Sequence, residues 1–213
     1  MDAAPPTPEP DTGHEAEPTV VVLLAAGGGS RFGGREHKLL ALLDGRPVAE
    51  HAISTALDAG VGPVVVVTGA TDLLGVDADL LDRVHVVANP DWADGQSTSL
   101  RVAVETARDR FAAGAIVVGL ADQPGVAAEA WRRVAASASP VAVATYDGAR
   151  RNPVRLDRAV WNLLPESGDV GARLLVRLRP DIVEEVPCPG SAADIDTLED
   201  LRTWQSRSST NSP

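Results

Sequence analysis

The chain has 213 residues, of which 44% are hydrophobic and 23% charged, a composition close to the average of soluble globular proteins. Its net charge of −11 opposes sequence-independent binding to nucleic acid or to anionic membranes, and seven aromatic residues are few for stacking on bases. The single cysteine, Cys188, excludes an internal disulfide and fits a reducing compartment.

The sequence shows no targeting or membrane-spanning segment. The longest apolar run, Val20 to Ala26, is far too short to cross a bilayer. The first residues carry neither the basic nor the apolar part of a signal peptide. We therefore predict a cytoplasmic protein.

Composition divides the chain into one folded domain and two tails. Residues 1–18 hold five prolines and five acidic residues, which predicts a disordered, solvated tail. The Ser-rich residues 206–213 predict a second disordered tail. Residues 19–205 contain no linker or repeat and are predicted to form one domain.

Short Val-rich runs alternate with amphipathic stretches along this domain. The runs are bounded by turn residues and predict buried strands at Val20–Ala25, Pro63–Thr68, Val84–Val87, Ala115–Leu120 and Val141–Thr145. Helices are predicted at Val48–Ala59, Ser97–Arg110 and Ala127–Ser137. This alternation predicts an α/β layer fold with a mostly parallel sheet, whose ligand binds at the carboxyl ends of the strands.

The first strand leads into a glycine-rich loop, with five glycines between Gly27 and Gly34. Consecutive backbone N–H groups in such a loop form an anion site, to which Arg31 and Lys38 add positive charge. Lys38 is the only lysine beside 18 arginines, which is either chance or the mark of a site that needs a compact ammonium. The pattern predicts a polyphosphate site, and a flexible connection with incidental charges is the alternative. The Gly-Lys-Ser/Thr ending of a Walker A loop is absent.

Carboxylates follow later strands. Asp122 stands after Leu120 and before Pro124, where it is placed either to hold Mg²⁺ with phosphate oxygens or to cap the next turn. Near the C-terminus, Asp194 and Asp196 alternate in an extended segment and would point the same way, with Asp196 favoured as a second metal ligand. Further on, Thr197 and Asp200 form a variant of the capping box, and earlier in the chain Ser97 is a possible helix N-cap.

These segments resemble, in order and spacing, the motifs of the MobA-like nucleotidyltransferases, closest to the molybdenum cofactor cytidylyltransferase branch. The opening motif runs from Leu24 to Gly33 and on to Lys38, with an extra glycine before Ser30. Later motifs begin at Asn89, Leu120, Gly148, Gly168 and Asp194, and the resemblance spans about residues 20–204.

The resemblance implies a Rossmann-like three-layer α/β/α fold of the nucleotide-diphospho-sugar transferase type, with a mainly parallel mixed sheet. It implies that Lys38, Arg31 and Asp122 act in catalysis, and that Asp122 and Asp196 bind Mg²⁺. Nucleotide contacts would come from Leu24, Ala25, Ala26, Gly27, Gly28, Ser30, Arg31, Lys38, Gly95 and Ser99. Acceptor contacts would come from Arg151, Asn152 and Asp169.

The implied reaction is transfer of a nucleoside monophosphate to a phosphate-bearing acceptor, with release of pyrophosphate. Ala25-Ala26-Gly27 favours CTP over GTP, and the family implies a molybdopterin-type acceptor and a possible client molybdoenzyme. Three alternatives stay open at this point: a guanylyltransferase or another NTP transferase with a different acceptor, a non-catalytic protein that binds and delivers the cofactor, and a dinucleotide-dependent oxidoreductase.

Overall fold

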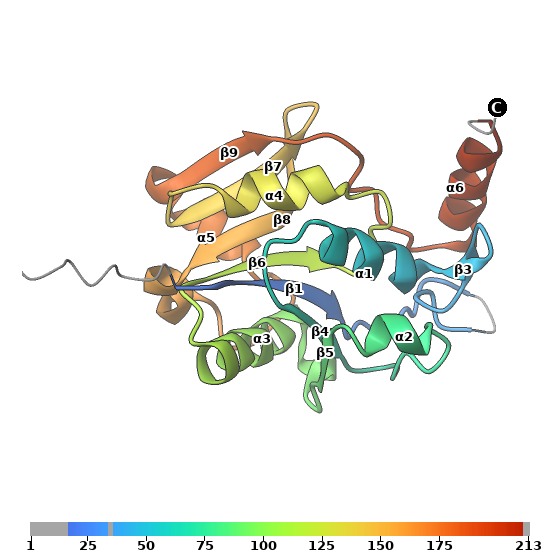
Figure 1. Cartoon of the computed structure of the whole chain (residues 1–213), viewed down its shortest axis with the longest axis horizontal. Helices are drawn as coiled ribbons and strands as arrows, with labels where there is room; N and C mark the ends of the chain where they lie inside the picture. The colour runs from blue at the N-terminus through green and yellow to red at the C-terminus, as the bar shows by residue number, and fades with distance from the viewer. Residues whose placement is uncertain (1–16, 34–35, 211–213) are drawn as a thin grey trace, which may run out of the picture.

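A computed structural model describes residues 17–33 and 36–210, and a seven-stranded sheet forms its centre (Figure 1). The predicted tail over residues 1–16, Gly34 of the loop and residues 211–213 lie outside this range. The strands follow the order β5, β4, β1, β6, β8, β7, β9. Their bounds are β1 Thr19–Ala25, β4 Val64–Thr68, β5 His85–Ala88, β6 Ala115–Leu120, β7 Val141–Tyr146, β8 Ala149–Asp157 and β9 Val183–Pro187.

Six of these strands run parallel, and β8 alone runs against its neighbours β6 and β7. The interior strand β1 pairs Val21 with Val64 of β4 on one side and with Val117 of β6 on the other. Its residues from Val20 to Ala25 are all buried, which explains the continuous apolar run in the sequence.

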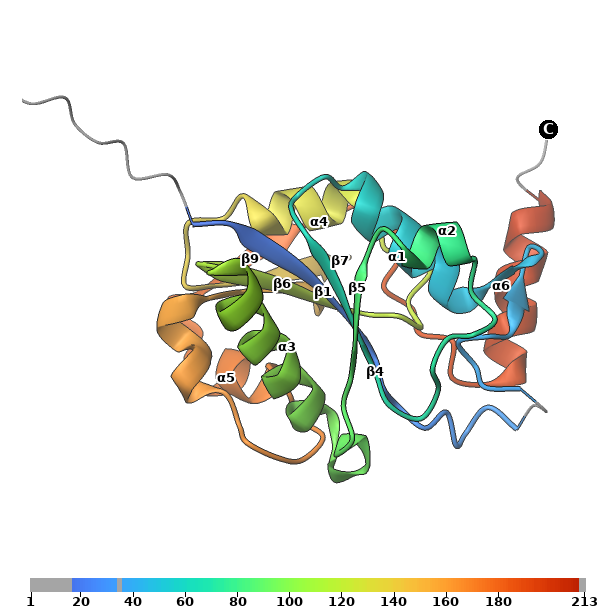
Figure 2. The same ribbon diagram turned by 60° about the horizontal axis from the view of Figure 1, so that its bottom comes forward.

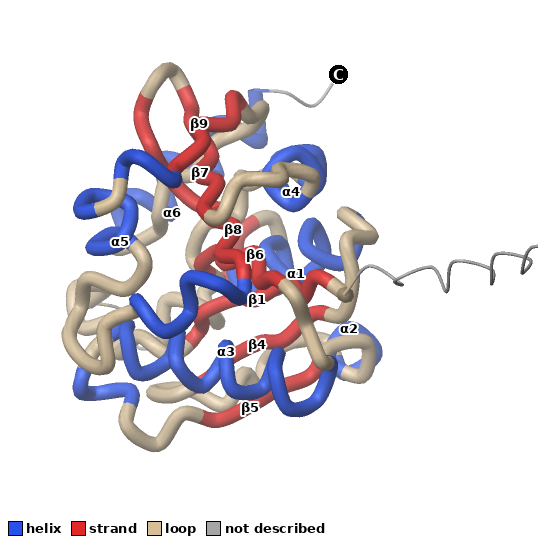
Figure 3. Tube along the Cα trace, turned by 90° about the vertical axis from the view of Figure 1, so that its left-hand side faces the viewer, coloured by secondary structure: helices blue, strands red, loops and turns tan. Residues whose placement is uncertain are grey.

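Helices cover both faces of the sheet and complete three layers (Figures 2 and 3). The odd-numbered residues of β1 pack on the side of α1 and α4, and the even-numbered residues on the side of α3 and α5. The helices are α1 Val48–Asp58, α2 Ala78–Leu81, α3 Gln96–Phe111, α4 Ala128–Ala135, α5 Arg173–Leu178 and α6 Leu198–Thr210. Short 3₁₀ turns lie at Trp92–Asp94, Arg158–Leu163 and Pro180–Ile182.

A small separate apolar cluster joins segments from near the start and near the end of the domain. The hairpin of β2 (Leu42–Leu43) and β3 (Arg46–Pro47) lies beside α6 (Figure 1). Phe32 from the glycine loop, Leu43 from the hairpin, Leu201 from α6 and Ile195 are buried against one another. This cluster fixes the glycine loop next to the chain segment that carries Asp194 and Asp196.

The structure confirms the α/β layers, the five predicted strands and the three predicted helices, and it adds elements that were not predicted. Residues 149–157, for which the sequence predicted no strand, form β8. β9 was also missed, and α6 extends to Thr210 through part of the predicted Ser-rich tail.

The predicted N-cap of α3 is wrong. Gly95, with a φ of 108°, holds that position. Ser97 lies inside the first turn, where its Oγ accepts a hydrogen bond from the N–H of Gly171 at 3.3 Å.

Substitution of Gly119 tests how tightly the core is packed. A Cβ on this β6 residue would lie 2.4 Å from Cη2 of the buried Trp131 of α4. We expect Gly119→Ala to lower the free energy of unfolding by about 1–3 kcal/mol, because the strand and α4 must separate to admit the methyl group. Urea denaturation measures this loss. Gly75→Ala is the control, since its Cβ would make an ordinary 3.4 Å contact with Leu40, and an equal loss in both variants would contradict the packing argument.

Candidate active site

The glycine-rich loop leaves β1 at its carboxyl end and turns back toward the sheet. The N–H of Phe32 donates to the carbonyl of Gly29 at 2.9 Å, and Gly29 has a φ of 60°, which a side chain would disfavour. His37 closes the loop from its far end. Because Nδ1 of His37 accepts from the N–H of Leu39 at 3.3 Å, its Nε2 carries the proton and donates to the carbonyl of Gly27 at 2.8 Å.

Lys38 lies between two carboxylates from distant parts of the chain. Its Nζ is 2.5 Å from Oδ2 of Asp122 and 2.8 Å from Oδ1 of Asp196. The other oxygen of Asp196 pairs with Nη2 of Arg31 at 3.0 Å. The side chains of Lys38 and Asp122 are 11% and 14% exposed, so this part of the network is largely shielded from water, while Arg31 is 76% exposed.

Burial and charge act on this network together. Burial raises the pKa of Asp122, and the adjacent Lys38 ammonium offsets the shift only in part. Burial alone would lower the pKa of Lys38, but the charges and hydrogen bonds of Asp122 and Asp196 outweigh it, so the pKa of Lys38 is raised. Lys38 is therefore a firmly protonated cation at neutral pH.

Backbone hydrogen bonds hold the two carboxylates in place. β6 ends at Leu120, and the N–H of Ala121 donates to the carbonyl of Leu24 on β1 at 3.1 Å. The N–H of Ile195 donates to the carbonyl of Asp122 at 2.9 Å, and Ile195 is fully buried. The predicted capping box is present just beyond: Asp200 Oδ2 accepts from the N–H of Thr197 at 2.8 Å, and Thr197 Oγ1 accepts from the N–H of Asp200 at 3.1 Å.

A cleft of about 540 Å³ opens over the loop, and we call it the glycine-loop cleft. Every residue predicted to contact the nucleotide lines it, namely Leu24, Ala25, Ala26, Gly27, Gly28, Ser30, Arg31, Lys38, Gly95 and Ser99, as do Asp122 and Asp196. Trp92 also lines it, with its ring 3.1 Å from where a Cβ of Gly28 would stand. The lining holds two cations, Arg31 and Lys38, and three carboxylates, because Asp169 joins Asp122 and Asp196.

A second cavity of about 720 Å³ adjoins the first, and we call it the arginine cavity. Leu24, Gln96 and Leu120 line both, so the two share a wall. Arg151 and Asn152, predicted on the acceptor side, line the arginine cavity. Asp169, predicted with them, lines the glycine-loop cleft instead. Its backbone neighbour Gly168 accepts from the N–H of Ser97 at 2.9 Å, and this bond holds the segment against the start of α3.

Asp194 and Asp196 face different cavities. Asp196 lines the glycine-loop cleft, whereas Asp194 lines the arginine cavity and accepts a hydrogen bond from Nε2 of Gln123 at 2.5 Å. Gln123, which is 2% exposed, also accepts from Nδ2 of Asn152 at 3.2 Å. Sequence analysis did not single out Gln123, whose only signal is its place after Asp122, and His37 could have been found only through its position beside Lys38.

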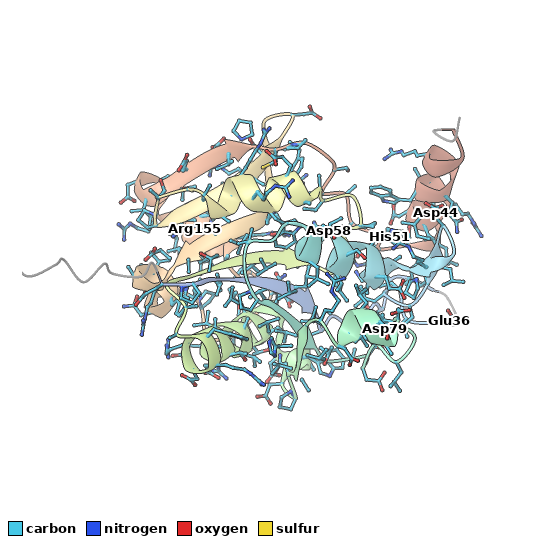
Figure 4. All side chains as sticks on the ribbon, viewed as in Figure 1. Glu36, Asp44, His51, Asp58, Asp79 and Arg155 are labelled. Atoms are coloured by element: carbon cyan, nitrogen blue, oxygen red, sulfur yellow. The ribbon has the colours of Figure 1, made fainter. Side chains whose placement is uncertain are left out.

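The other histidines with described positions lie away from both cavities. His51 of α1 faces the β2–β3 hairpin, where its Nε2 is 2.9 Å from the carbonyl of Leu43 (Figure 4). His85 of β5 packs edge-on against Phe111. Both therefore have structural roles, as their predicted places in a helix and a strand suggested.

No group of three or more His, Cys, Asp or Glu side chains within residues 17–33 and 36–210 is arranged to hold a metal ion. A metal at Asp122 and Asp196 would therefore need ligands from a bound molecule as well. In the same part of the chain, no helix has both the length and the apolar character needed to cross a bilayer.

Comparison with known proteins agrees with this geometry. The MobA-like NTP transferase domain matches residues 21–184, so the chain belongs to this family and is a nucleotidyltransferase. This result decides against the oxidoreductase hypothesis. A search of curated proteins found no match.

Solved structures share the fold along almost their whole length. A nucleotidyl transferase from Methanothermobacter thermautotrophicus is 24% identical, with a TM-score of 0.76 over 92% of this chain and 100% of its own. Rv0371c from Mycobacterium tuberculosis is 29% identical, with a TM-score of 0.75 over 90% of this chain and 99% of its own. Its complex with manganese is 28% identical, with a TM-score of 0.68 over 89% and 98%.

Removing the Lys38 ammonium should expose its two carboxylate partners to metal. We expect Lys38→Ala to bind Mn²⁺ without nucleotide at least about tenfold more tightly than the wild type, because Asp122 and Asp196 lose the cation between them. Turnover should fall far more than folding stability does. Paramagnetic resonance of free Mn²⁺ measures the binding. Lys38→Arg is the control, since it keeps a cation, and unchanged Mn²⁺ affinity in Lys38→Ala would contradict the arrangement.

His37 should act by holding the loop rather than by contacting the reacting atoms. We expect His37→Ala to weaken binding of nucleoside triphosphate by about three- to tenfold, because Gly27 loses its hydrogen bond and the loop must be ordered on binding. The turnover rate at saturation should change little. The KM and kcat of the variant, compared with those of His51→Ala, test this, and a loss confined to kcat would argue against it.

Proposed function

We propose that this protein transfers CMP from CTP to the phosphate of a small-molecule acceptor in a Mg²⁺-dependent reaction. An oxygen of the acceptor phosphate attacks the α-phosphorus of CTP and forms the new P–O bond. The bond from the α-phosphorus to the bridging oxygen breaks, and pyrophosphate leaves with that electron pair. The observation that carries this proposal is the position of Lys38 between Asp122 and Asp196, directly beside the glycine-rich loop.

The cleft supplies the groups that such a transfer needs. Backbone N–H groups from Gly27 to Ser30, together with Lys38 and Arg31, would hold the triphosphate and stabilise the charge that develops on it. Backbone groups of Ala25 to Gly27, with Gly95 and Ser99, would bind the base and sugar. Since the attacking group belongs to the acceptor, the protein contributes position and charge rather than a nucleophile.

The site suits a divalent metal. Oδ1 of Asp122 is buried and has no hydrogen-bond partner within the described residues, although its other oxygen contacts Lys38. With three carboxylates and two cations, the cleft has a net negative charge and is poorly suited to a triphosphate alone. Asp122 and Asp196 would hold Mg²⁺ together with phosphate oxygens, and the ion would neutralise phosphate charge. The manganese complex of the related Rv0371c supports a divalent metal.

The finer assignments rest on the sequence motifs. Ala25-Ala26-Gly27 favours CTP over GTP, and the order of motifs favours a molybdopterin-type acceptor. A product of this kind would be delivered to a client molybdoenzyme in the cytoplasm. The arginine cavity, which adjoins the nucleotide side across Leu24 and Leu120, is where we place the acceptor.

A thermal-shift panel tests the nucleotide and metal requirements. CTP, GTP, ATP, UTP and NAD(P)H are each added with and without Mg²⁺. A ligand at about one hundred times its Kd adds roughly 2.7 kcal/mol, which raises the melting temperature by about 5–10 °C in a domain of this size. We expect a shift with CTP only when Mg²⁺ is present. A shift with GTP alone would change the nucleotide, and stabilisation by NAD(P)H without Mg²⁺ would contradict the proposal.

The carboxylate assigned to the metal can be tested directly. We expect Asp122→Asn to abolish both the Mg²⁺-dependent shift and turnover, because a neutral amide cannot balance the charge of Mg²⁺. Asp181→Asn, which removes an exposed carboxylate paired with Arg179, is the control and should behave as the wild type. Normal turnover in Asp122→Asn would overturn the assignment.

A further inference from the structure

The arginine cavity has a strongly positive rim. Arg150, Arg151, Arg173 and Arg177 line it, against a single carboxylate, Asp194. This contrasts with the net charge of −11 of the whole chain and with the excess of carboxylates in the adjoining cleft. A cluster of this sign in an acidic protein attracts anions to one place on its surface.

Three of these arginines have no acidic partner among the residues that the structure describes. Arg150 pairs with Glu185 at 2.7 Å, and its charge is balanced. By contrast, Arg151 donates only to a backbone carbonyl, and Arg173 and Arg177 make no ion pair within residues 17–33 and 36–210. Arg173 and Arg177 are four residues apart on α5, which places them on one face of the helix.

The floor of the cavity is apolar. Leu100, Val118, Val143, Val154 and Val176 line the same cavity as the arginines and are buried. Val176 and Leu175 anchor α5 on the sheet, so the guanidinium groups are carried by a packed helix. The cavity thus offers an apolar surface for the body of a ligand and free cations for its charged group.

The cations that would act on the triphosphate are elsewhere. Lys38 and Arg31 line the glycine-loop cleft and do not line the arginine cavity. The phosphate that attacks the nucleotide must reach the shared wall at Leu24, Gln96 and Leu120. Charges on the far side of that wall are available for a different group of the same acceptor.

Resting on the proposed function, we infer that Arg173 and Arg177, assisted by Arg151, bind a second anionic group of the acceptor, separate from its attacking phosphate. The acceptor class is therefore a phosphate ester that carries a further anion on a body with an apolar face. Guanidinium groups suit this task because they donate paired hydrogen bonds to a carboxylate, a phosphate or another oxyanion.

Two small probes that differ in one charged group test this inference without nucleotide. 3-Phosphoglycerate and glycerol 3-phosphate share the phosphate, but only the first also carries a carboxylate. Titration of the full chain is followed through the Nε–H signals of its arginines by NMR. We expect 3-phosphoglycerate to bind about tenfold more tightly and to shift the signals of Arg173 and Arg177, since its carboxylate accepts charge-assisted hydrogen bonds from their guanidinium groups.

Matched variants assign the effect. The double variant Arg173→Ala/Arg177→Ala should bind both probes equally, whereas Arg150→Ala, which removes an arginine already paired with Glu185, should keep the difference. Arg173→Lys/Arg177→Lys should restore part of the difference in affinity between the probes. This variant separates the loss of charge from a loss of structure in α5. Equal binding of the two probes by the wild type, or a preference that survives in the double alanine variant, would overturn the inference.

Failure of the proposed function would look different. If no triphosphate stabilised the protein while 3-phosphoglycerate still bound more tightly than glycerol 3-phosphate, the second anion site would be supported and the proposed nucleotidyl transfer would be contradicted. If CTP and Mg²⁺ stabilised the protein while both probes bound equally, the transfer would stand and the second anion site would be wrong.

Discussion

The ion pairs of Lys38 with Asp122 and Asp196 connect three of the chain segments that line the cleft. Two of these residues are largely buried, and an isolated charge there would be costly, so each of them depends on the other for its charged state. The network therefore holds the site together before any ligand arrives. Under the proposed function, a metal-bound triphosphate would replace these contacts. Its phosphate oxygens would contact the Lys38 ammonium, and the metal would be held by the carboxylates.

The two cavities differ in the charge of their lining residues. The glycine-loop cleft holds more carboxylates than cations, whereas the arginine cavity holds four arginines and one carboxylate. A free anion is attracted to the second and repelled by the first. Under the proposed function, the triphosphate would enter the first together with a divalent cation. The protein would then separate two phosphate-bearing substrates by the charge that accompanies them, without a moving part.

Much of this arrangement follows from the sequence, and the rest depends on tertiary contacts. Apolar runs predict the buried strands, and the glycines with Arg31 and Lys38 predict the cleft. β8 was not predicted because it begins with exposed arginines and lacks a continuous apolar run, and β9 was missed because two consecutive exposed glutamates separate its half-buried valines. The placing of Asp169 and the contact of His37 with Gly27 depend on loop paths that periodicity does not encode. Likewise, α6 continues into a Ser-rich stretch because Leu201 anchors it in the small cluster with Phe32.

Under the proposed function, the wall between the cavities would set the distance between the reacting groups. Leu24 and Leu120 are paired residues of the adjacent strands β1 and β6, and both strands are buried in the core. Gln96 completes the wall at the first turn of α3. Because rigid elements form this boundary, under the proposed function the sheet rather than a loop would fix the separation of nucleotide and acceptor, and this would favour attack without a further ordering cost. The arginines that we propose for the acceptor lie on α5 and β8, outside that wall. Changes among them can therefore alter the acceptor while the transfer chemistry stays the same.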